Sequence, residues 1–160
     1  MSQDIFIKIN GIDGESPDAT HQNEIEVIDW DWEVRQDANM HKGQGGGSGK
    51  ATVEDLRFAH YLDRASPNLM KYCLTGKHIP ECVLTVRKAG GSPLEYLKLT
   101  LTDVVITRVR PIGSAGEPRM REDVSLSFSK IKQEYTVQNE QGGSGGAVTA
   151  GFDIKANKEA

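Results

Sequence analysis

The sequence predicts a mainly β protein, a small β-barrel of two bent antiparallel sheets with one short flanking α-helix at about residues 67–75. Apolar and polar residues alternate along most of the chain, which is typical of strands with one buried face. In two long runs, 24–34 and 122–138, this alternation changes phase. One extra residue turns the apolar side chains to the opposite face unless the backbone bulges. We therefore expect both runs to be bent strands, as in a small barrel or an orthogonal sandwich.

The other expected strands are shorter and keep one phase. In the first of them Ile5, Ile7 and Ile9 share a face, as is typical of a half-buried strand rich in β-branched residues. The same alternation predicts strands over 4–10, 52–62, 79–89, 94–102, 103–110 and 150–156. Glycine-rich stretches separate some of these strands, and we expect flexible loops at 39–50 and 112–118.

One segment carries helix signals. Ser66 is a candidate N-cap, Pro67 suits the first turn, and Gly76 is a natural stop after the last turn. The apolar stripe that should pack on the sheet consists of Leu69, Met70, Cys73 and Leu74. A helix this short is expected to form only by packing against another element.

Length and composition favour one soluble domain over residues 1–160. The net charge is −4, and no basic cluster exceeds Arg87-Lys88, which disfavours nucleic acid as a partner. No apolar run reaches the roughly 20 residues of a spanning helix, so we expect no membrane insertion. The N-terminus lacks the pattern of a secretory signal peptide, which predicts synthesis in the cytoplasm. Cys73 and Cys82 are expected to be free thiols.

Motifs for cofactors and metals are weak. The segment 43–50 approaches a phosphate-binding loop, but Gln44 stands where the first glycine should be and Ala51 where the magnesium-binding hydroxyl should be. The four histidines show no metal-ligand spacing. His60 lies on the apolar phase of its strand and is expected to be a partly buried, hydrogen-bonded side chain. The sequence therefore predicts no cofactor and no metal.

An acidic strand offers the best candidate for catalysis. Asp29, Asp31 and Glu33 alternate with Trp30 and Trp32, so the three carboxylates share one face. Mutual repulsion would raise a pKa there, as in a hydrolase, and the tryptophans could form a sugar-binding platform. Simple alternation, with tryptophan inward and acid outward, explains the same pattern and is favoured. We see no nucleophile motif and expect no enzyme.

Several segments, in their order along the chain, resemble the Hcp family, the haemolysin-coregulated tube proteins of bacterial type VI secretion. The matching segments are IFIKINGIDGE at 5–15, IEVIDW at 25–30, ASPNL at 65–69, GKHIP at 76–80, VRKAG at 86–90, VSLSF at 124–128 and TAGFDIKAN at 149–157. They cover nearly the whole length. The resemblance implies a small β-barrel with one flanking helix, in agreement with the residue patterns.

The resemblance also implies a function. Family members form hexameric rings that stack into a tube inside a contractile sheath, with a spike protein at the tip. Contraction exports the tube into a target cell, and the rings can hold effector cargo in their lumen. The implied localisation is the bacterial cytoplasm, followed by secretion through this machine without a signal peptide. The alternatives are a monomeric binding module or a hydrolase that uses Asp29, Asp31 or Glu33.

Stacked rings need protruding polar segments, and the helix is expected on the outer wall by analogy with tail tubes. The expected ring-stacking residues, in and beside the two glycine-rich loops, are Lys42, Gln44, Lys50, Ser114, Arg119 and Arg121. On the helix, Lys71 and Thr75 are expected to face the sheath. Polar contacts of exposed ion pairs contribute only about 0–1 kcal/mol each, so stacking should be weaker than ring closure.

Overall fold

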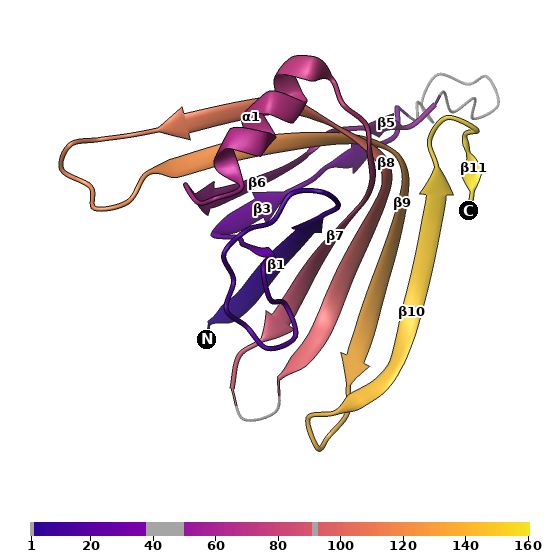
Figure 1. Ribbon diagram of the computed structural model, residues 1–160. Helices are drawn as coiled ribbons and strands as arrows, with labels where there is room; N and C mark the ends of the chain where they lie inside the picture. The colour runs from indigo at the N-terminus through magenta and orange to yellow at the C-terminus, as the bar shows by residue number, and fades with distance from the viewer. Residues whose placement is uncertain (1, 38–49, 91–92) are drawn as a thin grey trace.

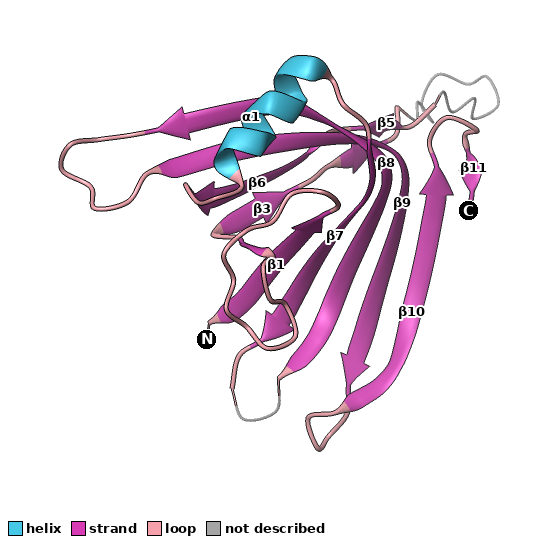
Figure 2. Cartoon of the chain, in the orientation of Figure 1, coloured by secondary structure: helices cyan, strands magenta, loops and turns pink. Residues whose placement is uncertain are grey.

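The computed structural model describes residues 2–37, 50–90 and 93–160, which form two antiparallel sheets and one helix (Figure 2). The larger sheet has the order β11-β10-β9-β8-β7-β1-β2, with β3 beside β6 and β6 beside β9, while β4 and β5 form a separate pair. The elements are β1 (Gln3–Ile9), β2 (Ile25–Glu26), β3 (Asp29–Asp31), β4 (Val34–Arg35), β5 (Thr52–Val53), β6 (Leu56–Tyr61), α1 (Ser66–Thr75), β7 (Ile79–Lys88), β8 (Leu94–Ile112), β9 (Arg121–Gln138), β10 (Ser144–Asp153) and β11 (Lys158–Glu159).

The large sheet bends into two layers, and the long strands β8 and β9 connect them because both strands run through both layers (Figure 1). In one layer, the first half of β8 pairs with β7 and the second half of β9 pairs with β10. In the other layer, the second half of β8 pairs with the first half of β9, which also pairs with β6, and β6 pairs with β3. The core fills the angle between these layers, where fully buried side chains include Ile7, Leu84, Leu99, Phe58 and Leu126. The predicted pair of bent sheets is confirmed, but the described strands do not close into a barrel.

The first phase change marks a change of strand partner. The Val27 amide donates to the Ile5 carbonyl of β1 at 2.9 Å, and the next amide, Ile28, donates to the Ala59 carbonyl of β6 at 2.8 Å. The run predicted as one bulged strand is therefore divided into β2, β3 and β4. The chain passes here from one layer to the other. The core lies on the opposite side of the strand in the second layer, so the apolar residues there occupy the other face of the strand.

The second phase change is shared by two strands. Leu101 faces Ile131 and Val104 faces Phe128 in an unshifted register, so both strands move their apolar residues to the other face at the same level. Asp103 lies at this level with a φ of 55°, which lets β8 turn without ending. The two strands predicted at 94–102 and 103–110 are consequently the single strand β8.

Three side chains secure the carboxylate of Asp103. His78 Nδ1 lies 2.7 Å from Oδ1, the Ser129 hydroxyl donates to Oδ2 at 2.7 Å, and Lys155 Nζ lies 3.3 Å from Oδ2. The hydrogen bonds from His78, Ser129 and Lys155 hold the pKa of Asp103 well below its usual range. This carboxylate thus stays ionised and ties β8, β9 and the segment after β10 together at the bend.

Substitutions at Asp103 should separate backbone strain from these contacts. Asp103→Val should lower the free energy of unfolding by about 1–3 kcal/mol from strain alone, because a β-branched residue is disfavoured at positive φ. Asp103→Asn should cost less, because asparagine tolerates this conformation and keeps hydrogen-bonding capacity. Urea unfolding at one fixed protein concentration checks this. Equal unfolding midpoints for the two variants would contradict the assignment of strain to this position.

The helix α1 begins one residue earlier than predicted and ends at Thr75, with Gly76 in the left-handed conformation as expected. Ser66 does not cap it; Ala65 occupies that position without a side-chain cap. The predicted apolar stripe is only half packed. Leu69 is buried and Cys73 half-buried, but Met70 is 53% exposed and Leu74 77% exposed. One apolar flank of the helix therefore faces away from the core of its own chain.

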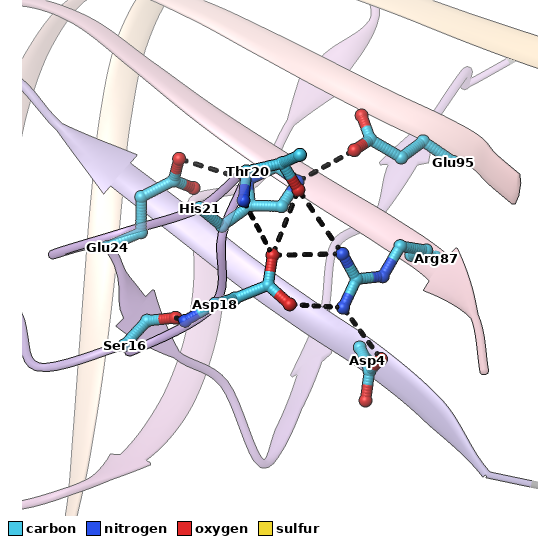
Figure 3. A network of polar contacts seen from close by, with 8 residues as sticks. All are labelled: Asp4, Ser16, Asp18, Thr20, His21, Glu24, Arg87 and Glu95. Carbon is cyan, nitrogen blue, oxygen red and sulfur yellow. Dashed lines mark hydrogen bonds and ion pairs between the residues drawn. The ribbon is translucent and has the colours of Figure 1, made fainter. Parts of the chain in front are cut away.

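A network of hydrogen bonds and ion pairs fixes the loop between β1 and β2 on one face of the large sheet (Figure 3). Arg87 of β7 donates to both carboxylate oxygens of Asp18, at 3.0 and 2.7 Å, and to Asp4 of β1 at 3.0 Å. His21 stacks on Phe6 with ring centroids 4.4 Å apart and lies between Glu24 and Glu95. The loop thereby buries Phe6 on the face of β1 opposite Ile7 and Ile9. The order of polar residues in the loop gave no indication that it would cover this face.

Candidate assembly surfaces

An apolar surface is uncovered where β9 and β10 extend beyond the core. Val86, Leu97, Tyr135 and Val148 are cross-strand neighbours in one row of β7, β8, β9 and β10. Along this row exposure rises from 2% at Val86 to 48% at Tyr135 and 66% at Val148, and Val137 on the same face is 43% exposed. The apolar face of the sheet that covers the core therefore extends beyond the core, onto parts of β9 and β10 that no other described element of the chain covers. We call Tyr135, Val137 and Val148 the arm face.

A second apolar surface lies beside α1. Figure 1 shows α1 near the first half of β9, away from the turn that joins β9 to β10. This surface is a groove of about 620 Å³ between α1 and the ends of β6, β8 and β9, and its apolar lining consists of Leu62, Pro67, Met70, Val109, Pro111 and Met120. Leu62 is 40% exposed and Met120 42% exposed, so these side chains lack full cover within one chain. Met70, on the exposed flank of the helix, contributes to one wall of this groove.

Asp63 and Glu122 of the groove lining belong to a buried ionic cluster around His60. His60 has no exposed surface, its Nε2 lies 2.8 Å from Glu122 Oε1, and its Nδ1 lies 3.7 Å from Asp63 Oδ1. Burial alone would lower the pKa of His60, but Asp63 and Glu122 outweigh it and raise the pKa to about 9. The expectation of a hydrogen-bonded, buried histidine is confirmed. The imidazolium fixes the end of β6 to β9 and to the turn that begins the helix.

Two strands present unpaired backbone edges at these surfaces. Within the described ladders, residues 144–150 of β10 pair only with β9, and residues 105–112 of β8 pair only with β9. An exposed edge is a template for pairing with another chain. Pro111 cannot donate a backbone hydrogen bond, so the edge of β8 beside the groove is partly blocked.

The acidic strand has a structural explanation. Asp29 pairs with Arg57 at 2.7 Å and with Arg121 at 3.0 Å, and Asp31 pairs with Arg57 at 2.7 Å. Glu33 pairs with Arg35 at 3.1 Å. Burial alone would raise the pKa of Asp29, but Arg57 and Arg121 lower it. The alternative of a pKa raised by mutual repulsion therefore fails at Asp29, because arginines from β6 and β9 face this carboxylate. The favoured interpretation, with tryptophan inward and acid outward, agrees with Trp30 and Trp32 packing against the core.

The predicted ring-stacking residues are dispersed. Lys42 and Gln44 lie outside the described residues, and Lys50 is exposed just before β5. Ser114 and Arg119 are exposed in the β8–β9 turn, where the Arg119 guanidinium lies 3.8 Å from the Tyr61 ring centroid. Arg121 is half-buried and bound to Asp29 and Asp123, so it serves the fold of its own chain.

The two predicted sheath-facing residues lie together on α1. Lys71 and Thr75 are exposed, and the Thr75 hydroxyl donates to the Lys71 carbonyl at 2.9 Å. Cys73 and Cys82 are free, as expected, and burial raises the pKa of Cys82 to about 12. Among the described residues no group of His, Cys, Asp or Glu is arranged to hold a metal ion. In those same segments no helix has the length and hydropathy to cross a bilayer.

Fold and surfaces together define a mainly β protein of two bent antiparallel sheets and one short helix, with two uncovered apolar surfaces. The chain belongs to the Hcp family of type VI secretion: the profile of the family described as "Type VI secretion system effector, Hcp" matches residues 6–135. It is 46% identical to the protein hcp1 of Pseudomonas aeruginosa over the full length of both chains. The family resemblance of the sequence segments is thereby confirmed.

Solved structures of relatives agree with this assignment. Hcp1 from Salmonella typhimurium is 56% identical, with full coverage of both chains and a TM-score of 0.85. A type VI secretion system effector from Yersinia pestis is 46% identical, with a TM-score of 0.78 over 94% of this chain and all of the other.

The sequence could not have identified the groove, because Leu62, Met70 and Met120 come from three separated segments.

Proposed function

We propose that residues 1–160 form one tube domain of the type VI machine, which assembles into hexameric rings that stack into the inner tube. Sheath contraction then exports the tube, and the ring lumen carries or protects effector cargo. The observation that supports this most is the uncovered arm face of Tyr135, Val137 and Val148. Membership of the family supplies the secretion system in which the assembly works.

Ring closure follows from having two unlike surfaces on one chain. A head-to-tail contact uses a different surface of each copy and closes into a ring when its rotation allows. The arm face of one copy would dock in the groove beside α1 of the next copy. Every copy would therefore contribute its arm face to one contact and its groove to another. Full burial of an exposed aliphatic side chain contributes about 1.5–3 kcal/mol. Val148, at 66% exposed, has most of this gain still available.

The opposite face of the large sheet is suited to line the lumen. Lys98, Thr100 and Thr102 of β8 pair with Glu134, Lys132 and Lys130 of β9, and these positions carry polar side chains throughout. A hydrophilic bore lacks apolar surface on which varied cargo would adhere. Lys71 and Thr75 would face the sheath from the outer wall, and a spike protein would cap the tube.

Stacking of rings rests on the exposed polar residues Lys50, Ser114 and Arg119, together with Lys42 and Gln44, in this proposal. Arg121 belongs to the same set, and its internal ion pairs with Asp29 and Asp123 would hold its side chain in place beside the turn. Exposed ion pairs contribute about 0–1 kcal/mol each and are screened by salt. Rings should therefore remain where tubes come apart.

Negative-stain electron microscopy of the purified protein tests this proposal. We expect six-fold annular particles at every salt concentration, and stacked tubes only at low ionic strength, because salt screens polar ring–ring contacts but not apolar docking. Fields that contain only small compact particles at micromolar protein would contradict ring formation. Tubes that persist in about 1 M salt would contradict polar stacking.

A further inference from the structure

The groove beside α1 contains both methionines that the structure describes. Met70 of α1 is 53% exposed, and Met120, just before β9, is 42% exposed. Both line the same groove, so their side chains are open to solvent in a single chain. Methionine is common at adaptable apolar binding surfaces, and its thioether is the group there most open to oxidation.

The described lining of the groove offers one uncharged side-chain donor for a polar change at these sulfurs, the Ser66 hydroxyl, whose oxygen accepts from the Asp63 amide at 3.2 Å. Leu62, Val109 and Pro111 offer no side-chain hydrogen-bond donor. Asp63 and Glu122 also line the groove, but their carboxylates are acceptors that already pair with His60. A sulfoxide oxygen is itself an acceptor, and two sulfoxides would exceed the single hydroxyl donor of the lining, leaving apolar surface or carboxylate for the rest.

We propose that Met70 and Met120 form an oxidation-sensitive site that controls docking in the groove. A hydroperoxide converts either thioether to a sulfoxide, and the oxidised groove no longer receives the arm face of another copy. Methionine sulfoxide reductase restores the thioether with a dithiol as reductant, which is oxidised to a disulfide while the oxygen leaves as water. This inference rests on the proposed function, because it assigns the groove to a contact between copies.

The chemistry is a two-electron oxygen transfer. A lone pair of the methionine sulfur attacks one oxygen of the hydroperoxide, the O–O bond breaks, and an S–O bond forms. The sulfur is oxidised, and the hydroperoxide is reduced to water or to an alcohol after its proton moves to the leaving oxygen. No metal or further cofactor takes part in this step.

Assembly and oxidation should exclude each other. In a ring the groove is occupied, so the sulfurs are shielded and only free copies react. In a free copy, docking would remove the sulfoxide oxygens from water, and the described groove lining offers them only the Ser66 hydroxyl as an uncharged donor. We therefore expect each sulfoxide to weaken a subunit contact about tenfold. Because every contact of a ring uses the same groove, oxidised copies should remain monomeric.

Hydrogen peroxide provides the direct test, with the Met70→Leu/Met120→Leu double variant as the matched control. Leucine keeps the apolar volume but cannot be oxidised, whereas Met1 and Met40 remain in both proteins. Both proteins are dissociated in mild denaturant, treated with peroxide, and returned to native buffer. Peptide mass mapping locates the sulfoxides, and native mass spectrometry reads the assembly. We expect oxidised wild type to stay monomeric and the treated double variant to form rings.

Three results would overturn the inference. Oxidised wild type that forms rings with sulfoxide mapped at both positions would show that the groove tolerates it. Loss of rings in the treated double variant would assign the effect to another oxidised residue, namely Met1, Met40 or one of the free thiols Cys73 and Cys82. Equal reaction rates of Met70 and Met120 in rings and in dissociated copies would show that the contact does not cover them. Untreated wild type that forms no ring would instead refute the proposed function itself.

Discussion

Val148→Glu is expected to convert the proposed rings to monomers. Val148 is 66% exposed on β10 and belongs to the arm face, which we assign to the contact between copies. A buried carboxylate without a partner costs several kcal/mol, which exceeds what a single apolar contact contributes. Because the side chain is exposed in one chain, the fold itself should survive. Sedimentation velocity measures the change of mass, and circular dichroism shows that the strands are retained.

The neighbouring residue supplies a matched control. Thr149 is exposed on the same strand but points to the opposite face, because successive side chains of a strand alternate. Thr149→Glu adds the same charge one residue away and should leave the rings intact. If both variants, or neither, lose the rings, the arm face is not the contact surface.

The stability of each chain should fall as the pH rises from about 6.5 to about 9. His60 has its pKa raised to about 9 in the folded protein, so its charge stabilises the fold fully below the unfolded value of 6.5. Above that value the contribution decreases, and it is lost as the pH passes the folded pKa. At about 1.4 kcal/mol per pKa unit, the loss is on the order of 3 kcal/mol. Loss of the proton leaves the buried Glu122 without its cationic partner.

Urea unfolding at several pH values checks this, using Val148→Glu as the background so that assembly does not add to the apparent stability. His60→Leu should cost about 3–5 kcal/mol, because it leaves a buried carboxylate unpaired. His60→Leu/Glu122→Leu should recover part of this, because the buried charge leaves with its partner. A double variant as unstable as the single one, or a free energy of unfolding that is flat from about pH 6.5 to 9.5, would refute the ionic cluster.

Residue patterns predicted the strands and the bends but not their causes. The phase change after Val27 reflects a change of partner from β1 to β6, and partners far apart in sequence leave no local signal. At the second bend, the positive φ of Asp103 depends on contacts with His78, Ser129 and Lys155, which no short motif contains. The bends were therefore predictable from alternation, whereas the absence of a closed barrel was not.

The assembly surfaces show the same limit. Alternation identifies Tyr135, Val137 and Val148 as apolar, and helical spacing does so for Met70 and Leu74. Periodicity cannot tell whether an apolar side chain faces its own core or another copy of the chain. That distinction required the exposed fractions, which put these side chains outside the core. The ion pairs of the acidic strand left no local signal for a related reason, because Arg57 and Arg121 come from distant strands.

Mixing two defective variants tests the head-to-tail contact most directly. Val148→Glu removes the arm face but keeps the groove, and Met70→Glu removes the groove but keeps the arm face. Each alone should be a monomer of 17.5 kDa by native mass spectrometry. Their mixture should give a dimer of about 35 kDa, twice 17.5 kDa, and nothing larger, since only one intact contact can form. Wild type should give about 105 kDa, six times 17.5 kDa. A mixture that stays monomeric, or either variant forming rings alone, would contradict docking of the arm in the groove.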